Sequence, residues 1–212
     1  MKISFLNIII IILYNNNMEL EEIKYKLTPV QHDFFYALKE YIELPIYFIG
    51  SILRYDYFKG YSDLDIDVFS PDPDSTKLKI KHFLNSEKKD RIIFININKY
   101  PMSGYKFYYN NSFKDEKRVE FDLSIFKEST KKILLETRFT YCEIPFIVLV
   151  YFLIIKTLHY RICIINNEYY TKLKKLIWVF INKDLNPQFM NYDEYTDIYK
   201  KNYPNTKYMV NI

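Results

Sequence analysis

One stretch, from Ser62 to Val68, constrains the fold of this 212-residue chain more than any other. It reads Ser-Asp-Leu-Asp-Ile-Asp-Val, so acidic and aliphatic residues alternate. Because strand side chains point alternately to the two faces of a sheet, this pattern predicts a strand with an acidic face and an apolar face. The acidic face carries Asp63, Asp65 and Asp67. Neighbouring carboxylates repel each other, and a divalent cation bound among them would relieve that repulsion.

A short apolar strand and a small-residue turn precede the acidic strand. Ile46 to Ile49 is predicted as a buried strand, and Gly50 and Ser51 follow it directly. Such a turn allows backbone N–H groups to approach a phosphate closely. We expect a short helix after the turn that contains Arg54, and we expect its start to contribute to phosphate binding.

A second strand with the same design is predicted between residues 118 and 126. Glu120, Asp122 and Ser124 would share one face, and the apolar residues between them would share the other. Asp122 lies between Phe121 and Leu123, so it is an acid in an apolar setting. Asp122 and Glu120 are therefore both candidates to join the first acidic strand in one site.

The other periodic segments mix strands and helices, which predicts an α/β chain of the α+β type. A helix is expected to begin with Thr28 as its N-cap, Pro29 as its first residue and Gln31 completing a capping box. Further helices are expected over residues 75–87, 145–159 and 169–180, and further strands over residues 91–97 and 105–109. We expect the helix over 145–159 to pack against the back of the sheet. Lysines 172, 174 and 175 are expected to form the solvated flank of the last helix.

Three regions are expected along the chain. Residues 18–130 form the core, and residues 131–212 form a helical region packed on it. Residues 1–17 are an apolar extension, too short to span a bilayer comfortably. This extension is interpreted as a targeting segment or anchor, as residues upstream of a true start at Met18, or as a packed element. We expect no membrane association of the core.

Net charge, cysteine spacing and the absence of two nucleotide-binding motifs limit the functions that the sequence predicts. The net charge of +4 is small, and the lysines are spread along the chain, so nucleic-acid binding is not required. The two cysteines have no paired-motif spacing, which indicates reduced thiols and a cytoplasmic location. The sequence has neither a Walker loop nor a dinucleotide-binding glycine pattern.

The order of these motifs resembles the signature of the DNA polymerase β-like nucleotidyltransferase superfamily, in particular its small, minimal members. The resemblance covers residues 46–126 and rests on Gly50-Ser51, the following gap, Asp63-Leu64-Asp65 and the later Asp122. Arg54 and Ser62 also match the pattern. The family implies a mixed, mostly antiparallel sheet of about four or five strands with helices on one face, followed by C-terminal helices.

The resemblance also implies an activity and a set of site residues. The activity is transfer of a nucleoside monophosphate from an NTP, with ATP expected, to a hydroxyl acceptor, with Mg²⁺ or alternatively Mn²⁺ as cofactor. The implied catalytic residues and metal ligands are Asp63, Asp65 and Asp122. The implied nucleotide- and phosphate-binding residues are Gly50, Ser51, Arg54 and Ser62.

Several alternatives stay open at this point. Asp65 and Asp67 could replace Asp63 and Asp65 as the metal-binding pair, although Ser62 and the gap favour the first pair. Arg54 is interpreted either as a phosphate contact or as the structural partner of a neighbouring acid. The fold could also be a catalytically inactive, antitoxin-like binding module, and the same acids could serve a metal-dependent phosphoesterase. The acceptor is a small molecule, a protein or an RNA.

Overall fold

A computed structural model describes residues 19–85, 91–97, 100–110, 119–142, 144–181, 188–189 and 201 of the chain. The expectations for residues 1–17 and for a start at Met18 lie outside this described part. The strands are β1 (Ile46–Ile49), β2 (Leu64–Ser70), β3 (Arg91–Ile97), β4 (Tyr100–Asn110), β5 (Glu120–Lys127) and β6 (Gln188–Phe189). The α-helices are α2 (Leu20–Ile23), α3 (Pro29–Ile42), α4 (Pro73–Phe83), α5 (Lys131–Cys142), α6 (Phe146–Lys156) and α7 (Asn167–Ile181). Short 3₁₀ segments are η1 (Lys24–Lys26), η2 (Gly50–Leu53) and η4 (Glu128–Thr130), and a π-helical segment, η5 (Thr157–Arg161), extends α6.

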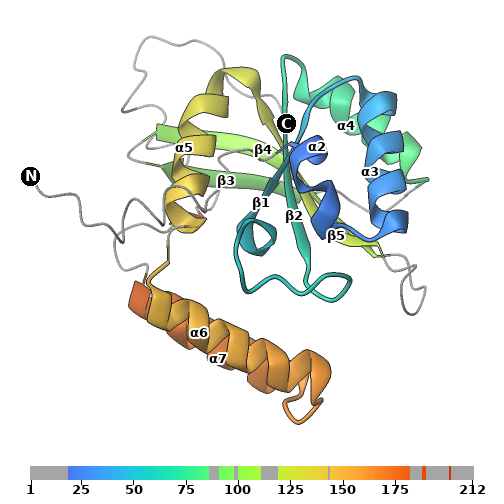
Figure 1. Ribbon diagram of the computed structural model, residues 1–212. Coiled ribbons are helices and arrows are strands. Elements are labelled where there is room, and N and C mark those ends of the chain that lie inside the picture. The colour runs from blue at the N-terminus through green and yellow to red at the C-terminus, as the bar shows by residue number, and fades with distance from the viewer. Residues whose placement is uncertain are drawn as a thin grey trace, which may run out of the picture.

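The strands form one open sheet in the order β1-β2-β5-β4-β3-β6 (Figure 1). β2 and β5 pair in parallel, and the other neighbouring strands pair antiparallel. The sheet is therefore mixed and mostly antiparallel, as expected, with five strands of four or more residues and the two-residue β6 at one edge. The parallel pair, β2 and β5, lies inside the sheet and joins the two strands that were predicted to carry acids.

Helix α3 begins as its sequence predicts. The Thr28 hydroxyl accepts a hydrogen bond from the Gln31 backbone N–H, and the Gln31 side chain accepts one from the Thr28 N–H. Pro29 occupies the first turn, where its missing N–H costs no hydrogen bond. The helix buries Phe35, Leu38 and Ile42 against the sheet.

Two apolar layers lie on opposite faces of the sheet. The larger one joins α3 and α4 to the alternate strand residues Leu64, Ile66 and Val68 of β2, as the alternation predicted. The smaller one joins Phe69 and Phe126 to Leu134 of α5. Helices α3 and α4 therefore cover one face, and α5, the first helix after the core strands, lies on the opposite face (Figure 1). The acidic residues of β2 share this second face.

Helices α6 and α7 lie side by side at one end of the sheet and do not cover its back (Figure 1). The prediction for residues 145–159 was wrong in this respect. Phe152, Ile155 and Tyr170 form a small separate core between the two helices. One face of α6 stays exposed, as the 77% and 78% exposures of Phe146 and Ile147 show. Among the described residues, none of the helices combines the length and the apolar character needed to cross a bilayer.

Candidate active site

Pairing of β2 with β5 brings two of the predicted site acids together. Asp65 lies directly opposite Asp122 in the parallel register, and directly opposite Ile49 in the antiparallel register with β1. Residues that lie opposite each other in neighbouring strands project from the same face of a sheet. The sheet thus places Asp65 between Asp122 and the end of the strand that leads into the glycine turn.

Gly50 begins the 3₁₀ helix η2 with a φ of 75°, a left-handed conformation that favours glycine. A β-carbon at this position would lie 2.7 Å from Oδ2 of Asp65. The backbone of the turn and the carboxylate of Asp65 are therefore packed against each other, with no room for a side chain at position 50. Ser51 follows within η2, and its carbonyl accepts a hydrogen bond from the Arg54 N–H at 3.0 Å.

Asp65 is the electrostatically strained acid of the site. Burial is the largest cause that raises its pKa, to about 6, and the charges of Asp63 and Asp122 raise it further. The ammonium groups of Lys174 and Lys106 act in the opposite direction. Asp63 itself is exposed just before β2 begins. The sequence predicted repulsion among Asp63, Asp65 and Asp67, whereas the charges that raise the pKa of Asp65 are those of Asp63 and Asp122.

Asp67 has a different role from Asp63 and Asp65. Its side chain is fully buried, and its Oδ2 accepts a hydrogen bond from Nε of Arg138 on α5 at 3.2 Å. Its Oδ1 is buried without a hydrogen-bond partner among the described residues. Burial raises the pKa of Asp67, and Arg138 opposes that change. This ion pair ties Asp67 to α5, which favours Asp63 and Asp65 as the site acids.

The two acids of β5 also have different partners. Oδ2 of Asp122 lies 2.8 Å from Nζ of Lys106 on β4, and both side chains are about one-third exposed, at 33% and 34%. The Glu120 carboxylate accepts a hydrogen bond from the Tyr108 hydroxyl at 2.6 Å. Asp122 is the acid that lies beside Asp65, which favours it over Glu120 as the third site residue.

Asp63, Asp65 and Asp122 supply the carboxylate oxygens that Mg²⁺ takes as ligands, so their chemistry fits a divalent cation. Their placement fits less well. Within the described part of the chain, no three His, Cys, Asp or Glu side chains gather closely enough to hold a metal. Asp122 is instead paired with the Lys106 ammonium. Metal binding would therefore require side-chain movement at this pair.

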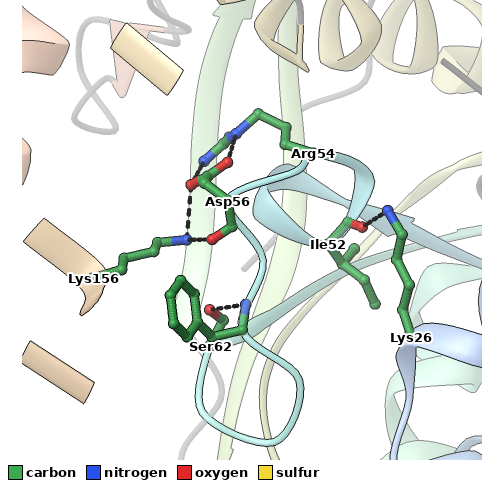
Figure 2. A network of polar contacts seen from close by, with 7 residues as sticks. Lys26, Ile52, Arg54, Asp56, Ser62 and Lys156 are labelled. Atoms are coloured by element: carbon green, nitrogen blue, oxygen red, sulfur yellow. Dashed lines mark hydrogen bonds and ion pairs between the residues drawn. The ribbon is translucent and has the colours of Figure 1, made fainter. Parts of the chain in front are cut away.

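Arg54 belongs to a buried ion-pair network and not to an open phosphate site (Figure 2). Its Nε and a terminal nitrogen donate to the two carboxylate oxygens of Asp56, at 2.7 and 3.0 Å. Nζ of Lys156, on α6, lies 2.9 Å from Oδ2 of Asp56 and donates to its backbone carbonyl at 2.8 Å. The structure therefore shows the second of the two alternatives for Arg54, that of a structural partner.

This network joins α6 to the loop that connects the glycine turn with β2. Burial raises the pKa of Asp56, but the hydrogen bonds and charges of Arg54 and Lys156 outweigh it, and the net shift is downward. The loop also contacts the π-helical extension of α6. The ring centroids of Phe58 and Tyr61, in the loop, each lie 5.9 Å from the ring centroid of Tyr160, in the extension. The C-terminal helices are thus anchored beside the turn.

Ser62 and Tyr57 complete the loop. The Ser62 hydroxyl accepts a hydrogen bond from the Phe58 N–H at 3.1 Å, so it closes the loop that delivers Asp63 (Figure 2). The Tyr57 hydroxyl is buried without a hydrogen-bond partner among the described residues. Burial and the charge of Asp63 both raise the pKa of Tyr57. The structure gives Ser62 a role in shaping the loop, whereas its sequence motif suggested phosphate binding.

Three lysines near the site were not identified from the sequence. Lys174 was assigned to a solvated flank, yet it is partly buried and its charge lowers the pKa of Asp65. Lys106 and Lys156 lie in segments that carried no recognisable motif. Alternation along β4 could have placed Lys106 on a polar face, but not beside Asp122. Comparison with known proteins adds no further assignment, because no protein-family model, curated protein or solved structure matches this chain.

Proposed function

We propose that this chain is a metal-dependent nucleotidyltransferase that moves a nucleoside monophosphate from an NTP, with ATP expected, to a hydroxyl acceptor and releases pyrophosphate. One observation carries the proposal: Asp65 lies beside Asp122 while its carboxylate packs against the backbone of the Gly50 turn. Carboxylates for a metal and backbone N–H groups for a phosphate are thus adjacent, as nucleotidyl transfer requires.

Each residue has a distinct role in this proposal. Asp63, Asp65 and Asp122 would hold Mg²⁺ or Mn²⁺, which neutralises phosphate charge and lowers the pKa of an attacking hydroxyl. The backbone N–H groups of Gly50 and Ser51, with the Ser51 hydroxyl, bind the terminal phosphates of the NTP. Partial exposure of Asp122 allows an acceptor hydroxyl to approach it.

The lysines around the acids also suit a nucleotide substrate. Both Lys106 and Lys174 are close enough to Asp65 to lower its pKa through their positive charge. Two ammonium groups beside the carboxylates offset the negative charge that a triphosphate brings into the site. They support a polyphosphate substrate over a neutral one.

Nucleotide binding and transfer can be tested with the full chain, Mg²⁺ and radiolabelled NTPs, offered with small-molecule, protein and RNA hydroxyl acceptors. The variant Asp63→Ala, Asp65→Ala should lose transfer. The matched control is Asp33→Ala, Glu40→Ala, which removes two exposed carboxylates from α3 and should keep transfer. The proposal would be refuted if the wild type and the Asp63→Ala, Asp65→Ala variant behaved identically, with neither binding nucleotide nor transferring label.

The released product separates this reaction from phosphoester hydrolysis by the same acids. Nucleotidyl transfer releases pyrophosphate. Release of inorganic phosphate, or of a free nucleoside monophosphate without a labelled acceptor, would instead assign the acids to a phosphoesterase.

A catalytically inactive binding module is the second candidate function. It is favoured by the pairing of Asp122 with Lys106 and by the absence of a three-residue metal group within the described part. Binding of an NTP that survives in the Asp63→Ala, Asp65→Ala variant, with no transfer by the wild type, would support this candidate.

A further inference from the structure

We propose that Lys106 is a built-in counter-ion that a divalent cation must displace from Asp122, and that it thereby sets the metal affinity of the site. The inference rests on the proposed function, because it concerns the same three carboxylates. It assigns to Lys106, on β4, a positioning role that the sequence motifs do not contain.

Strand register places Lys106 on the acidic face. Lys106 lies opposite Ser124, and Tyr108 lies opposite Asp122, in the antiparallel pairing of β4 with β5. Phe107, between them, points to the other face and joins the large apolar core. The Lys106 side chain therefore projects from the face of the sheet that carries Asp122.

The Lys106 ammonium lies among several carboxylates. Its nitrogen is 2.8 Å from Oδ2 of Asp122, which is a direct charged hydrogen bond. Its charge also lowers the pKa of Asp65 and of Asp67. One ammonium thus counters the charge of acids on both β2 and β5.

A metal and this ammonium compete for the same oxygen. Mg²⁺ binds carboxylate oxygens at about 2.0–2.1 Å, so a cation on Oδ2 of Asp122 would occupy the position of the ammonium proton. Lys106 can leave, because its flexible stem is 34% exposed.

The competition has a consequence for affinity. Metal binding must break one partly exposed ion pair and place a dication near a displaced ammonium. Removing the ammonium should therefore strengthen metal binding. Replacing lysine by arginine should not, because a guanidinium keeps the charge and can hold a carboxylate through two hydrogen bonds.

Calorimetric titration of the metal-free full chain with Mn²⁺ alone, without nucleotide, tests the inference. Lys106→Gln should bind Mn²⁺ roughly two- to fivefold more tightly than the wild type, the size expected from loss of one such ion pair. Lys106→Arg should bind equally or more weakly. Lys132→Gln, which removes the same charge from an exposed position on α5, should bind as the wild type does.

The outcomes separate this inference from the proposed function. Unchanged or weaker Mn²⁺ binding by Lys106→Gln, or tighter binding by Lys106→Arg, overturns the role of Lys106 and leaves the metal site standing. If the wild type binds no Mn²⁺, both the metal site and the inference fall. Circular dichroism checks that each variant folds. If Lys106→Gln does not fold, the Mn²⁺ affinity of Lys106→Arg is the test.

Discussion

Replacing Asp65 with asparagine should stabilise the metal-free protein at neutral pH. The Asp65 carboxylate is partly buried beside Asp63 and Asp122, and its pKa is raised to about 6 from an ordinary value of 3.8. Folding therefore disfavours the charged form of this side chain. Asparagine keeps nearly the same shape but carries no charge.

The size and the pH window follow from that pKa. A shift of one pKa unit corresponds to about 1.4 kcal/mol, so a rise of about two units costs roughly 3 kcal/mol of folding free energy. Screening by solvent reduces this to about 1–3 kcal/mol. Since the pKa is higher in the folded state, the cost is absent below pH 3.8 and fully present above about pH 6.

Urea unfolding of the wild type and of Asp65→Asn, at pH 4 and pH 7.5 without divalent cations, measures this difference. We expect Asp65→Asn to be more stable by about 1–3 kcal/mol at pH 7.5 and equal to the wild type near pH 4. Glu40→Gln, an exposed control on α3, should change stability by less than about 0.5 kcal/mol at both pH values. A variant no more stable than the wild type at pH 7.5, or a gain independent of pH, would refute the reasoning.

The other predictions concern the buried network, the glycine turn and the helix cap. Asp56→Asn leaves two buried cations without their carboxylate and should cost about 3–5 kcal/mol in urea unfolding, whereas Lys156→Met, which keeps one ion pair, should cost less. Gly50→Ala should lower the melting temperature more than Gly60→Ala, because both have positive φ but only Gly50 has a carboxylate oxygen 2.7 Å from the added β-carbon; equal losses would contradict the close contact. Thr28→Ala removes the α3 cap and should cost about 1 kcal/mol in urea unfolding, while an unchanged midpoint would show that the cap contributes nothing.

Local patterns predicted most of the fold. The capping box at Thr28, the strand from Ile46 to Ile49 and the alternation along β2 were each found where the sequence indicated. These signals involve residues a few positions apart, so they can be recognised without knowing how the rest of the chain folds. The same holds for Asp122, whose apolar neighbours mark it as a residue on a half-buried strand.

Amphipathic periodicity was a weaker guide to which helix residues are buried. Helical spacing places Val30 and Tyr41 on one apolar stripe with Leu38, yet they are 38% and 42% exposed, while Phe35 is fully buried. The direction in which α3 packs on the sheet decides between these neighbouring faces. The predicted position of α6 was wrong for a related reason. An apolar run predicts burial of a helix, but it does not indicate which surface the helix will contact.

The sequence alone predicted most of the longer strands and helices, and it showed that acids alternate with apolar residues on two of the strands. Only the tertiary structure decided which acids meet, because the parallel pairing of β2 with β5 joins residues distant in the chain. It also decided the roles of the lysines, since Lys156 reaches Asp56 across 100 residues and Lys106 reaches Asp122 from a neighbouring strand. The sequence does not show which acid a lysine will contact, and the carboxylate that packs against its ammonium group determines its electrostatic role.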